Sequence, residues 1–174
     1  MIHVYHGDGK GKTTAAMGLA LRFVGRGRRV LVCQFLKDGS SGEVRMLAAM
    51  DAVTVLADTP PVKFSFRMSD EERAAARVEH DEHLAAAIRA LRGGDADLVV
   101  LDEAISSINT GMLDRELVAE ALELAAGEQD GPELVLTGRN PPEDVLSRAD
   151  YITEMRCERH PFEAGVRARE GVEY

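Results

Sequence analysis

Apolar and polar positions along the chain form alternating blocks that predict strands and helices in turn. Near-continuous apolar runs, typical of strands buried on both faces, fall at residues 2–5, 29–35, 52–56, 97–103, 134–139 and 151–155. Helical spacing of apolar residues between them predicts helices at about residues 12–25, 43–50, 70–92, 115–126 and 143–149. This alternation predicts an α/β fold, a mostly parallel sheet with helices on both faces.

Local sequence signals locate the start of the longest predicted helix. Ser69 and Glu72 have the spacing of a capping box, in which each side chain bonds the other residue's backbone N–H, so the helix is expected to begin just after Ser69. The stretch before it, residues 58–68, contains Pro60-Pro61 and no regular period, and it is predicted to be irregular.

A glycine-rich stretch separates the first predicted strand from the first predicted helix. It reads Gly7-Asp8-Gly9-Lys10-Gly11-Lys12-Thr13-Thr14. Strand, glycine-rich loop and helix in this order are typical of a phosphate-binding loop, because backbone N–H groups and the helix N-terminus attract phosphate. We predict that Lys12 binds the outer phosphates and that Thr13 offers its hydroxyl to Mg²⁺. His6 stands where the usual pattern has a glycine, so this loop is a variant.

Two acidic residues, Asp102 and Glu103, end the apolar run at residues 97–103. An apolar strand that ends in an acid is where nucleotide-binding folds hold Mg²⁺, opposite the phosphate loop. Both residues are therefore metal-site candidates. Glu103 has two possible roles, either as a ligand of the metal or its water shell or as the group that activates water in a hydrolytic ATPase, and the sequence does not decide between them.

Two further pairs of residues are candidates for a functional role. His80 and His83 lie three residues apart, whereas zinc sites on a helix usually place histidines four apart, so a metal pair is disfavoured and His80 is expected beside the apolar stripe. Phe64 and Phe66 lie two residues apart in the irregular stretch and would project to the same side of an extended chain. They either fill the core beneath the loop or form an aromatic surface, and the residues alone favour the core.

Composition narrows the class of protein. With 174 residues, of which 45% are hydrophobic, the chain is expected to form one domain over residues 1–174. Its net charge of −9 argues against general nucleic-acid binding. No apolar run is long enough for a membrane span, and no signal peptide is visible. The two cysteines have no metal-binding spacing, so a cytoplasmic protein is expected.

Several motifs occur together and in order from end to end of the chain. They are Gly7-Asp8-Gly9-Lys10-Gly11-Lys12-Thr13-Thr14-Ala15-Ala16, Gln34-Phe35-Leu36-Lys37, Val100-Leu101-Asp102-Glu103, Thr137-Gly138-Arg139, Ala149-Asp150, His160-Pro161-Phe162-Glu163-Ala164-Gly165-Val166 and Gly171-Val172-Glu173-Tyr174. In this set the chain resembles the P-loop type ATP:corrinoid adenosyltransferases. The doubled Gly-Lys and the motif that begins at His160 are specific together, and neither is expected in a generic ATPase.

The resemblance implies a RecA-like sheet and, usually, a homodimer. It implies that the 5′-deoxyadenosyl group of ATP moves to cobalt(I) of a corrinoid, either cobalamin or cob(I)yrinic acid a,c-diamide, with release of triphosphate. A flavoprotein reductase is the implied source of reduced cobalt, and Mg²⁺ accompanies ATP. Cobalt(I) is a strong nucleophile, so the reaction requires positioning and charge stabilisation but no general base.

The resemblance also assigns residues. Thr13 and Glu103 match the family's magnesium ligands, and Arg22 and Arg139 lie where they could reach the nucleotide. Phe64 and Phe66 match aromatics that lie beneath the corrin ring, although the second position is tryptophan in some members. Such aromatics exclude water and a lower axial ligand, which favours four-coordinate cobalt(II) and eases its reduction.

Two other functions compete with adenosyl transfer. The first is a RecA-like P-loop ATPase in which Glu103 activates water. The second, a nucleoside or small-molecule kinase, is weaker because no acceptor site can be named. The product formed from ATP separates them: triphosphate for the transferase, ADP and phosphate for the ATPase.

Overall fold

The computed structural model describes residues 1–63, 65–127 and 130–172. In these residues the chain forms a six-stranded sheet with the order β3-β2-β4-β5-β1-β6, in which every neighbouring pair is parallel. The strands are β1 (Ile2–His6), β2 (Val30–Gln34), β3 (Val53–Leu56), β4 (Leu98–Asp102), β5 (Glu133–Gly138) and β6 (Tyr151–Glu154). The predicted α/β class with a parallel, RecA-like sheet is confirmed.

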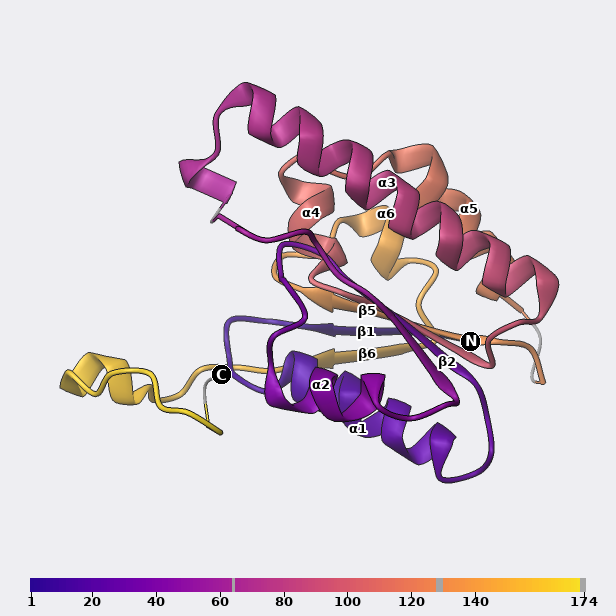
Figure 1. The fold of residues 1–174 in the computed structure, drawn as a ribbon, viewed down its shortest axis with the longest axis horizontal. Coiled ribbons are helices and arrows are strands. Elements are labelled where there is room, and N and C mark those ends of the chain that lie inside the picture. Colours follow the sequence, from indigo (N-terminus) through magenta and orange to yellow (C-terminus); the bar gives the residue numbers. More distant parts are fainter. Residues whose placement is uncertain (64, 128–129, 173–174) are drawn as a thin grey trace.

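Helices cover both faces of this sheet (Figure 1). The α-helices are α1 (Lys12–Val24), α2 (Gly42–Ala48), α3 (Asp70–Gly93), α4 (Ala104–Asn109), α5 (Arg115–Ala125) and α6 (Glu143–Leu146), and the short 3₁₀ helices are η1 (Ser65–Arg67) and η2 (Pro161–Ala164). Helices α1 and α2 lie on one face, and α3, α4, α5 and α6 lie on the other (Figure 1). Each face of the sheet therefore has its own apolar core.

The sequence pattern explains most of these elements. Every residue of β2 and β4 is buried, as continuous apolar runs require. The capping box is present: Glu72 N donates to Ser69 Oγ (3.2 Å), and Ser69 N donates to the Glu72 carboxylate (3.0 Å). Helix α4 escaped prediction because its six residues follow β4 with Glu103 as the sole intervening residue. The 3₁₀ helices η1 and η2 were also missed.

The topology brings the phosphate loop and the two acids to one edge of the sheet. In a parallel sheet all carboxyl ends lie at the same edge, and ligands bind there in open α/β folds. The phosphate loop follows β1, the two acids end or follow β4, and a polar loop follows β2. The segment with η1 and the C-terminal segment also project from this edge, on either side of it (Figure 1). Among the described residues no helix is both long and apolar enough to cross a membrane.

Candidate functional site

Close approach of another backbone segment shapes the phosphate loop. Gly9 N donates to Met155 O, just beyond β6, at 2.7 Å. A Cβ atom on Gly9 would lie 2.7 Å from that oxygen, and one on Gly7 would overlap it. Gly7 and Gly11 also adopt φ values of +111° and +115°. Gly7 meets both demands, Gly9 the first and Gly11 the second, and only glycine does so without strain, so these three residues fix the path of the loop.

The first turn of α1 faces the loop without a competing side chain. Its N-cap is Gly11, which offers no capping oxygen, and no acidic residue occupies the first turn. The unpaired N–H groups of a helix N-terminus and the helix dipole favour an anion there. Lys12 is buried beside them, and its Nζ donates to Gly9 O at 2.8 Å. Burial lowers the pKa of the Lys12 ammonium, against the opposing effect of the nearby Glu103 carboxylate.

Asp102 lies at the centre of the site and is fully buried. Its Oδ1 accepts hydrogen bonds from Thr13 Oγ1 (2.9 Å) and Thr137 Oγ1 (2.7 Å). Its Oδ2 accepts from Gln34 Nε2 (2.9 Å) and Lys37 Nζ (2.7 Å). These donors come from α1, β5, β2 and the loop after β2, so one carboxylate joins four segments. A buried charge persists when it is paired and hydrogen-bonded, as this one is.

Glu103 extends this cluster toward solvent. It adopts a left-handed conformation, with φ 59°, and its N donates to Thr137 Oγ1 at 2.9 Å. Its carboxylate accepts from Ser106 Oγ at 2.6 Å and lies 4.0 Å from Lys37 Nζ. A non-glycine residue with positive φ is uncommon and persists where the surroundings hold it. The turn places the Glu103 carboxylate near the Lys37 ammonium, which also donates a hydrogen bond to the Thr13 hydroxyl.

The donor set fits a magnesium ion. Mg²⁺ prefers oxygen ligands and takes one or two carboxylates together with a substrate's phosphates. Thr13, Asp102 and Glu103 supply a hydroxyl and two carboxylates beside the phosphate loop. The Lys37 ammonium lies among these same groups, which shows that they accommodate a cation.

Other loop residues contact the C-terminal segment. Asp8 Oδ1 accepts a hydrogen bond from Cys157 N at 3.0 Å, and this bond is the main cause of a lowered pKa for the Asp8 carboxyl. Lys10 Nζ donates to Val172 O. Arg139, at the end of β5, donates to Asp8 O at 3.4 Å. Arg139 therefore lies at the phosphate loop, its contact with the nucleotide stays a prediction, and the C-terminal segment packs against Asp8 and Lys10.

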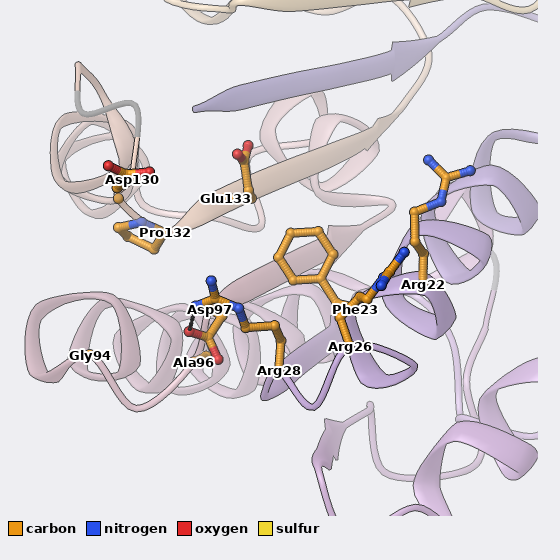
Figure 2. A pocket seen from close by; sticks show the side chains of 11 residues that line it. Arg22, Phe23, Arg26, Arg28, Gly94, Ala96, Asp97, Asp130, Pro132 and Glu133 are labelled. Carbon is orange, nitrogen blue, oxygen red and sulfur yellow. Dashed lines mark hydrogen bonds and ion pairs between the residues drawn. The ribbon is translucent and has the colours of Figure 1, made fainter.

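Arg22 lies away from the other predicted residues. It is ten positions beyond Lys12 on α1, and a helix rises about 1.5 Å per residue, which places it about 15 Å along the axis. It lines a hollow of about 860 Å³ together with Arg28, Asp97 and Glu133. Asp97 precedes β4 and Glu133 begins β5, so this hollow is at the amino edge of the sheet (Figure 2). The position does not support a role for Arg22 at the phosphate loop of its own chain.

The aromatic pair is described in part. Phe66, within η1, is 73% exposed, and the guanidinium carbon of Arg67 lies 5.6 Å from its ring centroid. Of the two alternatives for Phe66, the core position that the residues alone favoured is therefore wrong, and the exposed ring agrees with the surface that the resemblance implies. Phe64 lies outside the described residues.

The two histidines form part of a buried polar cluster. His80 is fully buried, and its Nε2 lies 3.0 Å from Asp58 Oδ2. Its Nδ1 lies 2.9 Å from Ser107 Oγ. His83 Nδ1 lies 3.9 Å from Asp58 Oδ1. His80 thus lies in the core as expected, with polar partners that the sequence did not identify.

Sequence reasoning gave no role to Gln34, Lys37, Thr137 or Ser106. Gln34 ends β2, Lys37 follows it shortly, and Thr137 lies next to the end of β5. The signal that identified Asp102, a polar residue where a buried strand ends, was present at Gln34 and Thr137 too. The sequence did not reveal the strand order, which places β2 and β5 on either side of β4.

A glycine-rich loop opposite an acidic strand end, on a parallel sheet of this order, defines a P-loop nucleotide-binding protein. Comparison with known proteins narrows this class. The profile of the family "ATP:corrinoid adenosyltransferase BtuR/CobO/CobP" matches residues 1–174, and the chain belongs to this family.

Individual relatives agree. The chain is 35% identical to a corrinoid adenosyltransferase of Escherichia coli K12 over 174 residues, covering all of this chain and 85% of the relative. It is 36% identical to the corrinoid adenosyltransferase CobA of Salmonella typhimurium over 176 residues, again with 100% and 85% coverage. A corrinoid adenosyltransferase of Pseudomonas aeruginosa is 32% identical, with 98% and 82% coverage.

Proposed function

We propose that the carboxyl edge of the sheet binds ATP with Mg²⁺ and transfers its 5′-deoxyadenosyl group to cobalt(I) of a corrinoid, releasing triphosphate. Family membership supports adenosyl transfer from ATP to a corrinoid and does not favour the hydrolytic ATPase. In this proposal residues 7–14 hold the triphosphate, and Thr13, Glu103 and Asp102 hold the metal.

One observation carries the assignment of this site. The uncapped N-terminus of α1, which favours an anion, adjoins a cluster of Thr13, Asp102 and Glu103 that already surrounds an ammonium group. A triphosphate that carries a divalent cation requires these two environments side by side. Lys12 and Arg139 add positive charge at the loop.

The reaction needs little proton chemistry. The cobalt(I) electron pair forms a bond to the ribose 5′ carbon, the C5′–O bond breaks, and its electrons leave on the oxygen of triphosphate. The protein therefore holds the carbon in line with the cobalt and stabilises the negative charge of the leaving group. Lys12, Arg139 and the N–H groups of α1 serve the second task. When bound, Mg²⁺ neutralises further phosphate charge.

The corrinoid side of the proposal rests on the segment between β3 and α3. Phe66 is exposed on η1, which projects from the edge that carries the phosphate loop (Figure 1). We place Phe66 and Phe64 against the corrin face opposite the attacked carbon, where they exclude water and a lower axial ligand.

Two partner proposals accompany this function. A flavoprotein reductase supplies the electron that converts cobalt(II) to cobalt(I). A homodimer is the proposed assembly, and the exposed edge strand supports it: all four residues of β6 are exposed, including Tyr151 and Ile152. Such an edge is a surface on which another chain can pair. Sedimentation equilibrium of the purified protein gives the assembly directly, and a monomer at micromolar concentration would contradict the dimer.

Substitution of the metal ligands tests the site. Thr13→Ala and Glu103→Gln each remove one proposed oxygen ligand, so each is expected to raise the Mg²⁺ concentration needed for half-maximal transfer by roughly tenfold to a hundredfold. The measurement is a Mg²⁺ titration at saturating ATP, followed by the absorbance of the cobalt–carbon product. If both variants keep the wild-type requirement, the metal site is elsewhere.

A further inference from the structure

The ammonium of Lys37 occupies the position that the proposed metal site assigns to a divalent cation. Lys37 Nζ lies 2.7 Å from Asp102 Oδ2, 2.9 Å from Thr13 Oγ1 and 4.0 Å from Glu103 Oε1. These are the three groups proposed to hold Mg²⁺. The Lys37 ammonium already neutralises the fully buried Asp102 carboxylate. The negative charge of Asp102 therefore has a counter-ion without a metal.

The geometry at Thr13 makes the two cations competitors. The Thr13 hydroxyl has one proton, which it donates to Asp102 Oδ1 at 2.9 Å. Its oxygen then accepts a hydrogen bond from Lys37 Nζ at 2.9 Å. A metal ion bound to that oxygen would lie next to the ammonium, and two cations so close together repel each other strongly. The ammonium must move before a metal can bind Thr13.

The backbone that carries Lys37 is held by a second buried cluster. Leu36 adopts φ 59°, and its N donates to Asp58 Oδ2 at 2.6 Å. Asp58 N in turn donates to Lys37 O at 2.9 Å. The Asp58 carboxylate is 7% exposed and lies 3.0 Å from His80 Nε2. This paired contact fixes a backbone conformation that a leucine rarely adopts, and it directs the lysine toward Asp102.

We propose that Lys37 is an internal counter-ion that excludes divalent cations from the nucleotide-free site. Its ammonium moves away from Thr13 and Asp102 when ATP and the metal bind together. The inference rests on the proposed metal site at Thr13, Asp102 and Glu103. The triphosphate supplies new negative charge next to Lys37, so the ammonium moves from Thr13 to a phosphate oxygen while the metal takes its place. Metal and nucleotide therefore bind together, and free metal binds the empty enzyme poorly.

The test is a titration of nucleotide-free protein with Mn²⁺, which suits the same oxygen ligands as Mg²⁺ and loses its free-ion paramagnetic resonance signal on binding. Lys37→Met removes the competing charge and keeps most of the side chain's length. It is expected to bind Mn²⁺ at least about tenfold more tightly than the wild type, or about 1.4 kcal/mol. Lys63→Met is the matched control, because it removes the same charge from an exposed lysine that pairs with Glu72.

The melting temperature is a second readout, and it shows whether the Lys37 variants are folded. Loss of the ammonium leaves Asp102 without its counter-ion, so Lys37→Met is expected to have a lower melting temperature than the wild type, and millimolar Mg²⁺ without nucleotide is expected to restore it. The wild type and Lys63→Met should not respond to Mg²⁺. If Lys37→Met is too unstable to purify, Lys37→Gln keeps a hydrogen-bond donor without the charge and is expected to show the same gain in Mn²⁺ affinity.

The outcomes separate this inference from the proposed site. If the wild type binds Mn²⁺ with ATP and the Lys37 variants gain no Mn²⁺ affinity over Lys63→Met, the counter-ion role is wrong and the metal site stands. If the gain in Lys37→Met persists undiminished after Thr13→Ala and Glu103→Gln are both added, the metal binds elsewhere, and both proposals fail. Tight Mn²⁺ binding by nucleotide-free wild type would also overturn the counter-ion role.

Discussion

Lys12 has the most constrained position of the cations at the phosphate loop. Its ammonium is buried, and it donates to a carbonyl of the loop, Gly9 O, at 2.8 Å. Burial lowers the pKa of Lys12, which means that the folded protein disfavours its charged form. A buried ammonium whose charged form is disfavoured is typical of a functional site, where a bound anion such as phosphate compensates its charge.

Lys12→Ala is expected to abolish measurable adenosyl transfer and to leave the fold intact. A charge-assisted contact is worth about 1.5–3 kcal/mol, and more where leaving-group charge develops in the transition state. The stability should not fall, since the charged side chain is disfavoured by burial. Turnover from chemically reduced corrinoid measures the first effect, and thermal unfolding measures the second. Near-normal turnover in a folded Lys12→Ala variant would contradict the proposed role of Lys12 in binding phosphate.

The two cysteines differ sharply in environment. Cys33 is fully buried in β2, and burial raises the pKa of its thiol to about 12. Cys157 is partly exposed beside the phosphate loop. Because the thiolate is the reactive form, a disulfide reagent at pH 8 should modify one thiol of the native protein and both after denaturation. Equal native reactivity of the two thiols would contradict the burial of Cys33.

At the level of elements, the segment from β3 to α3 stands apart from the core. It carries η1 and the exposed ring of Phe66, and it ends at the capped start of α3. The ring of Phe66 is 73% exposed and contributes little to the core, which agrees with the proposed contact with a corrinoid. The segment is also joined to the proposed metal site, because Asp58 forms hydrogen bonds with the backbone of Leu36 and Lys37.

Phe66→Ala is expected to change the free energy of unfolding by less than about 0.5 kcal/mol, as exposed positions do. It should weaken the four-coordinate cobalt(II) state, visible in the paramagnetic resonance spectrum of bound corrinoid, and slow transfer from cobalt(II) with a reductase more than transfer from cobalt(I). Phe35→Ala, which removes a fully buried ring, is the contrasting variant and should cost about 3–5 kcal/mol. An unchanged cobalt spectrum in Phe66→Ala would contradict the proposed contact of Phe66 with the corrin ring.

The sequence predicted elements with strong local signals and missed those without them. The phosphate loop is a contiguous motif, and buried strands are continuous apolar runs, so Thr13, Asp102 and Glu103 were placed correctly at one edge. Lys37 was given no role, because its contact with Asp102 depends on the pairing of β2 with β4, which no local pattern encodes. The residues alone favoured a core position for Phe66, because periodicity does not distinguish an aromatic ring in the core from one exposed on a loop. The exposed ring agrees instead with the surface position that the family resemblance implies.

On the scale of the whole molecule, parallel strand order is what creates the site. Strands β2, β4, β5 and β1 are consecutive in the sheet, and the residues at their carboxyl ends form the hydrogen-bonded cluster around Asp102. The segment that carries Phe66 and the C-terminal segment flank the same edge (Figure 1). Nucleotide, metal and corrinoid sites are thus proposed along a single edge, and distant stretches of sequence contribute to each.

The products of ATP test this account most directly. Wild-type protein is incubated with ATP, Mg²⁺ and chemically reduced corrinoid, and phosphate products are separated by ion-exchange chromatography while the absorbance of the cobalt–carbon bond is followed. The account predicts one triphosphate for each adenosylated corrinoid and no ADP above the level of a control without protein. Formation of ADP and phosphate in place of triphosphate, with no cobalt–carbon product, would contradict it and identify a hydrolytic ATPase.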